Sequence, residues 1–318
     1  MVPLLDGITR RWLMRSNSPY KTEIAAIAGA LGFPGVWFLN GSYEWGCTSL
    51  ARDEGAPWLV RTLDWPFPGL GRHVEIARMA GPAGDFYNVT WPGFVGILTA
   101  MAPGRFSASV NQAPLWRRTQ HPLLRPYDML VNAIGTWSIR NIPPTQLLRQ
   151  VFESCADFDT ARRKLETTPI ARPVIFTLAG ARPGECCVIE RTEDEHLTRF
   201  EHTSAANDWL VCRKFWEARV GGDQLFTAPP SEVGGNSKIR REALDGWTGP
   251  LDTANFAWVT PPVLNKFTRV ATEMCAAQGV LRVVGYEQAD GSELPRPVTR
   301  TGEIAASPDD NRATGLAS

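Results

Sequence analysis

The chain has 318 residues, of which 43% are hydrophobic and 21% charged, and its formal net charge is zero at pH 7. These values are typical of a globular protein, and they exclude a disordered chain and a basic, nucleic-acid-binding one. No run of about eighteen apolar residues is present, so we expect no stable membrane insertion.

The cysteines and histidines indicate no metal centre and no cofactor. Six cysteines are scattered along the chain, and only Cys186 and Cys187 are close together, as expected for a buried pair on a strand. No Cys/His cluster accompanies the four histidines. The N-terminus lacks the charged start and apolar core of a secretory signal, which favours a reduced, cytoplasmic protein.

The first predicted element is a helix that begins after Ser18-Pro19 and ends at Gly32. Serine is a good helix cap, proline suits the first turn, and glycine commonly ends a helix. The spacing of its apolar residues predicts one buried stripe, formed by Ile24, Ile27 and Leu31.

A β-hairpin follows, with a cysteine at its start. Residues 47–51 favour a strand, Asp53-Glu54-Gly55 predicts a turn, and residues 58–60 favour the returning strand. The return brings Arg61 and Asp64 near the cysteine. A guanidinium close to a thiol favours the nucleophilic thiolate, although these two charged residues could also form a simple surface ion pair.

The remainder alternates strands and helices, which by itself indicates a mixed α and β protein. After an aromatic, proline-rich loop at 65–69, we expect strands at 86–91, 95–99, 106–111, 173–180, 186–191, 196–200, 209–215, 268–275 and 280–286. Helices are expected at 122–137, 145–155, from an Asp157 or Asp159 cap to 165, and at 237–244.

Three blocks resemble a known family. The order Cys47-Thr48-Ser49, acidic-Gly turn, Arg61-x-x-Asp64 is similar to cysteine N-terminal nucleophile (Ntn) hydrolases related to choloylglycine hydrolase. Residues 93–111, which end in Ser109-x-Asn111, follow the acid ceramidase and N-acylethanolamine amidase branch almost position by position. The helix at 237–244 and residues 261–268 also resemble that branch.

The resemblance implies an α+β protein with a four-layer αββα sandwich, in which two antiparallel sheets pack face to face between helices. It also implies three parts along the chain. Residues 1–46 would be a pro-segment or small subunit, residues 47–290 the Ntn hydrolase catalytic domain, and residues 291–318 an extended or disordered tail rich in Pro, Gly, Asp and Ser.

The resemblance further implies self-cleavage between Gly46 and Cys47, where glycine lets the backbone bend and leaves the carbonyl open. The freed α-amine of Cys47 would then be the general base, so no histidine is needed. The remaining expected roles are thiolate support by Arg61, orientation of the amine by Asp64, binding of the substrate carbonyl or placement of an oxyanion donor by Asn111, and a charge contact to Arg61 or Asp64 from Arg240, with Arg241 as the alternative register.

Two departures from the branch concern the substrate site. Gln112 stands where a Glu often follows the asparagine, and the expected oxyanion-hole Asn aligns with Lys214 or Phe215. Asn207 is near in sequence but precedes the predicted strand, so Lys214 or Arg213 would have to replace the donor. Predicted substrate contacts are Trp65, Trp91, Gln112 and Lys214, with the two tryptophans equally consistent with core packing.

The function implied is hydrolysis of a linear amide, with a lipophilic acyl group carried as a thioester on Cys47. The partner would be a small-molecule amide with an acyl chain, and an assembly of identical chains is left open. Two enzymatic alternatives are an acyltransferase and an acylase of penicillin or bile-salt type. The two departures from the branch leave a third alternative, a homologue that binds acyl ligands without catalysis.

Overall fold

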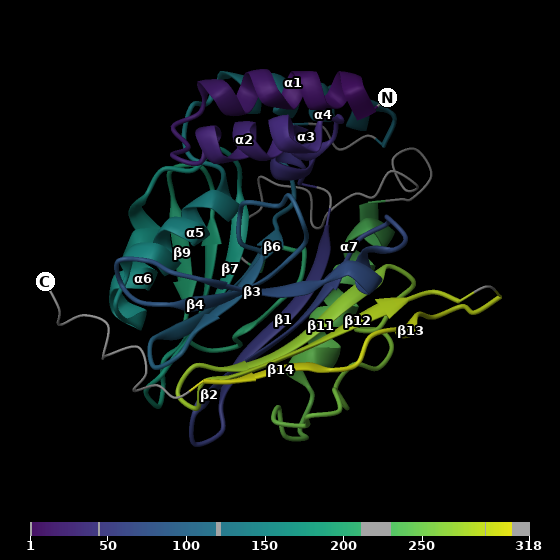
Figure 1. The fold of residues 1–318 in the computed structure, drawn as a ribbon. Helices are drawn as coiled ribbons and strands as arrows, with labels where there is room; N and C mark the ends of the chain where they lie inside the picture. Colours follow the sequence, from purple (N-terminus) through teal and green to yellow (C-terminus); the bar gives the residue numbers. More distant parts are fainter. Residues whose placement is uncertain (1, 44, 119–121, 211–229, 290, 307–318) are drawn as a thin grey trace, which may run out of the picture.

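The computed structural model describes residues 2–43, 45–118, 122–210, 230–289 and 291–306. Two antiparallel sheets pack face to face, with β1 and β2 of one sheet against β6 and β7 of the other. Helices α5 and α6 cover the outer face of the second sheet, and α7 packs on β1 of the first (Figure 1). The predicted order of layers, helix, sheet, sheet, helix, is therefore confirmed.

The first sheet carries the hairpin and has the strand order β10-β1-β2-β11-β12-β13, with β14 also paired to β12. Its strands are β1 (Gly46–Asp53), β2 (Pro57–Asp64), β10 (Ser204–Ala205), β11 (Thr268–Cys275), β12 (Val280–Glu287), β13 (Arg296–Pro297) and β14 (Gly302–Ala305). The predicted tail thus contains two short strands that extend this sheet.

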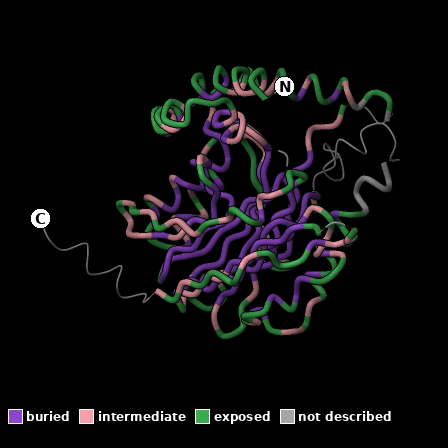
Figure 2. Tube along the Cα trace, turned by 45° about the vertical axis from the view of Figure 1, so that its right-hand side comes forward, coloured by how far each residue is buried: buried purple, intermediate pink, exposed green. Residues whose placement is uncertain are grey.

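The second sheet is a meander in chain order, from β3 to β9. Its strands are β3 (Glu75–Met79), β4 (Phe86–Thr90), β5 (Thr99–Ala102), β6 (Phe106–Gln112), β7 (Val174–Gly180), β8 (Cys186–Arg191) and β9 (His196–Arg199). Every residue of β6, β7 and β8 is buried, because one face meets the first sheet and the other meets helices (Figure 2). Such double burial explains the nearly continuous apolar run of β7.

Four helices gather at one end of the molecule, beyond the ends of the strands (Figure 1). They are α1 (Val2–Arg15), α2 (Lys21–Leu31), α3 (Val36–Gly41) and α4 (Arg125–Ser138); the others are α5 (Pro144–Ser154), α6 (Phe158–Thr167), α7 (Pro230–Asp245) and the 3-10 turns η1 (Leu70–His73) and η2 (Pro122–Leu124). No helix among the described residues is long and apolar enough to cross a bilayer.

The predicted hairpin is confirmed. β1 and β2 pair without a bulge from Gly46 opposite Asp64 to Asp53 opposite Pro57, and Gly55 turns the chain with φ 85°. Ser49 faces Arg61 across the pair. Since side chains two residues apart share a face of a strand, Cys47 and Arg61 project to the same side.

Several other predictions need correction. Residues 95–98 are not a strand, because their backbone donors bond elsewhere: Val95 N–H to Asn40 Oδ1 at 2.7 Å and Ile97 N–H to the Thr145 carbonyl at 2.9 Å. Residues 209 and 210 are not a strand, and 211–215 lie outside the described residues.

The helix predicted before the hairpin is present as α2, and Gly32 ends it in the left-handed conformation, as predicted. Its stripe is only partly buried: Ile24 is covered, Ile27 is half-buried, and Leu31 is 45% exposed near the helix end. Helices α1 and α3, on either side of it, were not predicted.

Candidate active site

Cys47 lies on β1 between the two sheets and is fully buried. Its Sγ is 2.8 Å from Nη2 of Arg61 and 3.5 Å from the carbonyl oxygen of Val110. Burial raises the pKa of the Cys47 thiol, and the Arg61 guanidinium acts in the opposite direction. The 2.8 Å contact fits the predicted support of the thiolate by Arg61. In this closed site, however, desolvation has the larger effect on the thiol pKa.

Arg61 is a buried cation, 1% exposed, on the returning strand β2. Its guanidinium donates to the carbonyls of Leu98 and Val110, each at 2.9 Å, and to Thr99 Oγ1. Within the described residues it makes no ion pair with a carboxylate, so the alternative of a surface pair with Asp64 is wrong. Because a buried charge is costly when no opposite charge meets it, Arg61 favours the thiolate at the adjacent sulfur and partly offsets the effect of desolvation.

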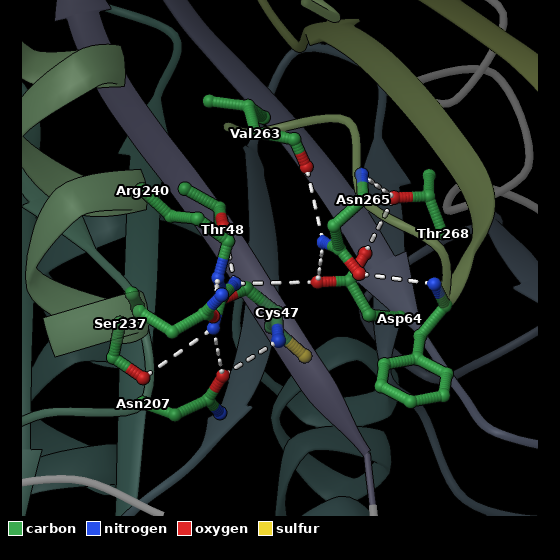
Figure 3. A network of polar contacts seen from close by, with 12 residues as sticks. Cys47, Thr48, Asp64, Asn207, Ser237, Arg240, Val263, Asn265 and Thr268 are labelled. Atoms are coloured by element: carbon green, nitrogen blue, oxygen red, sulfur yellow. Dashed lines mark hydrogen bonds and ion pairs between the residues drawn. The ribbon is translucent and has the colours of Figure 1, made fainter. Parts of the chain in front are cut away.

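Asp64 is the last residue of β2 and faces Gly46 across the pair. Both carboxylate oxygens are held, as Figure 3 shows: Oδ1 accepts from Thr268 Oγ1 at 2.9 Å, and Oδ2 accepts from Asn265 Nδ2 at 2.8 Å. Oδ2 also meets Nη1 of Arg240 at 3.2 Å. Asn265 and Thr268 belonged to the third resembling block, but no role was predicted for them.

Arg240 projects from α7 into the site and is buried. Besides Asp64, its Nη1 donates to the Cys47 carbonyl at 2.7 Å and to Thr48 Oγ1 at 2.6 Å (Figure 3). Of the two candidate arginines on this helix, Arg240 makes the contact with Asp64, whereas Arg241 faces away and pairs with Asp208 at 3.0 Å. Of its two predicted charge partners, Arg240 contacts the carboxylate of Asp64.

Asn207, which the sequence places before the aligned positions Lys214 and Phe215, contacts both Cys47 and Arg240. Its Oδ1 accepts the backbone N–H of Cys47 at 2.8 Å and meets Nη2 of Arg240 at 3.1 Å, while its Nδ2 donates to the Gln112 carbonyl at 2.8 Å. The two-residue strand β10, which pairs with β1, brings Asn207 there. Such a short strand leaves no periodic signal in the sequence; Arg213, Lys214 and Phe215 lie outside the described residues.

Asn111, which we expect to bind the substrate carbonyl or to place an oxyanion donor, contacts the neighbouring strands in this structure. It is buried on β6, and its Nδ2 donates to Ser49 Oγ at 3.1 Å and to the carbonyls of Ala205 and Ala206 at 3.2 Å. Its side chain therefore joins β6 to β1 and β10 and supports the loop that carries Asn207. Gln112 contributes its backbone carbonyl to Asn207.

The predicted substrate residues Trp65 and Trp91 are core residues in this structure. Both are buried, and Trp65 stacks edge-on with Trp45 and with Trp91, with ring centroids 5.9 Å apart in each pair. Their cluster lies directly beside the segment that leads into Cys47, where Tyr43 is also buried and bonds to the Pro173 carbonyl. The uncut chain thus covers its own nucleophile.

Gly46 has a different reason to be glycine from the one predicted. It sits in an extended strand rather than a bend, and a Cβ there would stand 3.2 Å from Cβ of Asp64. The close approach of Asp64 to the Gly46–Cys47 bond therefore favours glycine, since any side chain would push Asp64 away by a few tenths of an ångström. Within the described parts of the chain, no group of three His, Cys, Asp or Glu side chains could hold a metal ion.

The chain is similar in sequence to curated acid ceramidases and related amidases, although no family model matches it. It is 28% identical over 216 residues to a probable acid ceramidase of Caenorhabditis elegans, covering 61% of this chain and 52% of that one. It is 26% identical over 249 residues to the N-acylethanolamine-hydrolyzing acid amidase of Oryctolagus cuniculus, covering 75% and 64%. For Mus musculus acid ceramidase the identity is 30% over 197 residues, covering 61% and 46%.

These matches span about half to two thirds of the relatives' own length. In structure, the chain resembles the Caenorhabditis elegans N-acylethanolamine-hydrolyzing acid amidase ortholog with a TM-score of 0.52 and 16% identity, over 73% of this chain and 93% of that one. The likeness establishes the fold: two antiparallel sheets between helices, as in Ntn hydrolases.

Proposed function

From the premise that this chain is a homologue of acid ceramidases and N-acylethanolamine-hydrolyzing acid amidases, we propose that it is a self-processing cysteine amidase for linear amides with a lipophilic acyl group. One observation carries the proposal. The two reactive groups of Cys47 each have a fitting partner: Sγ meets Arg61, and the backbone nitrogen meets Asn207. Arg240 in addition holds the Cys47 carbonyl, which does not react.

The first step is cleavage of the chain between Gly46 and Cys47. The Cys47 sulfur attacks the Gly46 carbonyl carbon, the C–N bond breaks, and the nitrogen takes up a proton. The product is a thioester between Gly46 and Sγ, which water then hydrolyses. This sequence leaves Cys47 with a free α-amine and a free thiol, so nucleophile and base belong to one residue.

In turnover the α-amine accepts the thiol proton, and the thiolate attacks the substrate amide carbonyl. The reference pKa of an α-amine, about 7.7–8.0, suits a base near neutral pH. Asn207 Oδ1 already accepts from this nitrogen, which orients its lone pair once the chain is cut. The proton passes to the leaving amine, the acyl group stays on sulfur as a thioester, and water releases it.

The oxyanion of the tetrahedral intermediate needs hydrogen-bond donors. Asn207 Nδ2 carries two hydrogens; one bonds the Gln112 carbonyl, and we assign the second to the oxyanion. Arg240 binds Asn207 and Asp64 together, so it positions the donor rather than contacting the thiol. On this proposal Asn207 takes the place of the asparagine expected by resemblance, which favours a catalytic homologue over a non-catalytic one. An acyltransferase would use the same residues, with an amine acceptor in place of water.

Because Cys47 has no exposed surface in the uncut chain, substrate entry requires cleavage and displacement of the segment before it. We therefore assign residues 1–46 as a pro-segment or small subunit.

An intact-protein mass spectrum under denaturing conditions tests the proposal. We expect two polypeptides that join at Gly46/Cys47, no cleavage in Cys47→Ala, and normal cleavage in Cys275→Ala, which removes a buried thiol elsewhere in the same sheet. The processed protein is then assayed on N-acyl amides of increasing chain length, with and without an added amine. An uncut wild type without turnover on any amide would overturn the proposal and favour an acyl-binding protein.

A further inference from the structure

Two consecutive residues of one loop bind two consecutive residues of one helix beside Cys47. Asn207 Oδ1 accepts from Nη2 of Arg240 at 3.1 Å, and Asp208 Oδ2 accepts from Nε of Arg241 at 3.0 Å. The loop follows β10, and the helix is α7, which packs on both β10 and β1. Asn207 and Arg240 belong to the proposed site (Figure 3), whereas Asp208 and Arg241 take no part in the proposed reaction.

The ion pair of Asp208 and Arg241 is largely removed from solvent. The Asp208 side chain is 7% exposed and that of Arg241 is 11% exposed. The other carboxylate oxygen, Oδ1, is buried and has no hydrogen-bond partner within the described residues. Because a buried carboxylate is costly without a cation beside it, this contact ties the loop strongly to α7.

A second ion pair holds the backbone of the same loop from the other sheet. Glu190 of β8 accepts from Nε of Arg199 of β9 at 3.2 Å and from the backbone N–H of Leu210 at 3.4 Å. Arg199 Nη2 also donates to the Ser204 carbonyl at 3.2 Å. Since Ser204 precedes Asn207 and Leu210 follows it, the loop is fixed on both sides of the asparagine.

The contact of Arg241 determines how α7 is turned about its axis. Consecutive residues of a helix project about 100° apart, so Arg240 and Arg241 reach in different directions. If Arg240 alone held the helix, a small rotation would carry its guanidinium out of the site. Arg241 opposes that rotation, because it is tied to the residue next to Asn207. The other charge contact between α7 and this part of the chain, His202 with Asp245 at 3.5 Å, is mostly exposed and contributes little.

We propose that Asp208 and Arg241 are positioning residues, whose ion pair sets the relative placement of Asn207 and Arg240 at Cys47. Without the pair, the loop and α7 shift against each other, and the side-chain amide of Asn207 is no longer directed at the oxyanion. Neither residue touches the substrate, so the pair acts only through its two neighbours. The inference rests on the proposed function, since it concerns the residues of that reaction.

Kinetics of the processed protein test the proposal with four variants: Asp208→Asn, Arg241→Met, the two combined, and Arg241→Lys, which keeps the charge. The matched control is Arg162→Met/Glu166→Gln. It removes a partly buried ion pair with a 3.0 Å contact on α6, on the far side of the second sheet from Cys47. For each protein, kcat and KM of amide hydrolysis are measured well below the midpoint of its thermal unfolding.

We expect kcat to fall by about tenfold to a hundredfold in Asp208→Asn and in Arg241→Met, with KM little changed. The combined variant should be no slower than either single one, because the two residues act as a unit. Arg241→Lys should recover most of the rate, and the control should lose stability but keep its kcat. Wild-type kcat in both single variants, or an equal loss of kcat in the control, would overturn the proposal.

Hydrogen exchange gives a readout that needs no turnover. In Cys47→Ala, which stays uncut, the amide hydrogen of residue 47 is still bonded to Asn207 Oδ1. Adding Asp208→Asn or Arg241→Met should make this amide exchange about fivefold to tenfold faster, as weakening of one hydrogen bond allows, while the α6 control leaves it unchanged. Unchanged exchange with both substitutions would refute the positioning role. If wild type hydrolyses no amide at all, the proposed function fails, and the exchange rates still decide on Asp208 and Arg241.

Discussion

The backbone nitrogen of Cys47 donates a 2.8 Å hydrogen bond to Oδ1 of Asn207, which lies 160 residues further along the chain. The same amide group is fixed on its other side, where Nδ2 donates to the Gln112 carbonyl. A contact to the nitrogen of the scissile bond gives Asn207 a part in both steps of the proposed reaction. Before cleavage it touches the leaving amide, and afterwards it touches the base.

Replacing Asn207 by Ala should slow turnover by about 10²–10³, the usual cost of losing an oxyanion donor. Asn207→Asp keeps the oxygen that accepts from Cys47 but loses the amide donor. It should therefore be as slow as Asn207→Ala in turnover while its amine stays oriented. The rate constants of processing and of amide hydrolysis, measured separately by mass spectrometry and product release, check this. Wild-type turnover in Asn207→Asp would contradict a donor role.

The hairpin and the site around it differ in how far sequence could predict them. Cys47, Arg61 and Asp64 are joined by one short turn, so alternation and the Asp53-Glu54-Gly55 signal suffice to bring them together. Asn207 depends on a two-residue strand and on packing between distant segments. No periodicity in the sequence indicates either one, so sequence alone points to Lys214 or Phe215 for the donor.

For other residues, the sequence could not decide between a role in the site and a role in the core. Trp65 and Trp91 can line a pocket or fill a core, and their burial together with the edge-on contacts of Trp65 with Trp45 and Trp91 places them in the core here. Asn111 sits on the predicted strand, and its Nδ2 donates to Ser49 Oγ and to the Ala205 carbonyl of β10. Both partners are distant in sequence, so no local pattern predicts these contacts. Periodicity places the apolar side chains of α4, such as Leu130 and Ile134, on one face of the helix. It does not show what covers that face, so their exposure could not be predicted.

Removing the Arg61 charge should move the reactivity of Cys47 to higher pH. The cation lies 2.8 Å from the sulfur and opposes the rise in thiol pKa that burial causes, so its loss removes the largest opposing effect and leaves only the smaller one of Arg240. An opposite charge at such range shifts a pKa by about one to three units. The pH dependence of Cys47 alkylation in processed Arg61→Met should shift upward by that amount, and Arg61→Lys, which keeps the charge, should stay closer to wild type. An unchanged midpoint in Arg61→Met would mean that Arg61 does not stabilise the thiolate.

Alkaline pH should destabilise the fold through its buried thiols. Burial raises the pKa of Cys186 to about 12, against about 8.5 for a thiol in an unfolded chain. The folded state therefore holds its proton in a range where the unfolded state has lost it, and stability falls as pH rises between these values. The free energy of unfolding in urea, measured under reducing conditions at pH 7, 9 and 10.5, should decrease, and less so in Cys186→Ala. Equal slopes in the two proteins would contradict this assignment.

Gly46→Ala should impair self-cleavage without unfolding the protein. The new methyl group would stand 3.2 Å from Cβ of Asp64, so Asp64 must shift away from its partners beside the scissile bond. A misplacement of this kind can cost up to about a hundredfold in rate. The fraction of cut chain over time measures the effect, and Gly135→Ala, where a methyl group meets no atom within 4 Å, is the matched control. Cleavage of Gly46→Ala at the control rate would show that the close approach is irrelevant.

Asn265 and Thr268 should act as positioning residues for Asp64. They hold one carboxylate oxygen each, and Thr268 Oγ1 also accepts the N–H of Asn265, so the start of β11 forms one rigid clamp. Asn265→Ala or Thr268→Val frees one oxygen, and Asp64 then holds Arg240 less firmly at the Cys47 carbonyl. We expect kcat to fall by about tenfold to a hundredfold with KM little changed, because neither side chain contacts Cys47 itself. Thr268→Ser keeps the hydroxyl and should restore the rate; if it is as slow as Thr268→Val, the loss comes from packing of the methyl group and the clamp has no role in catalysis.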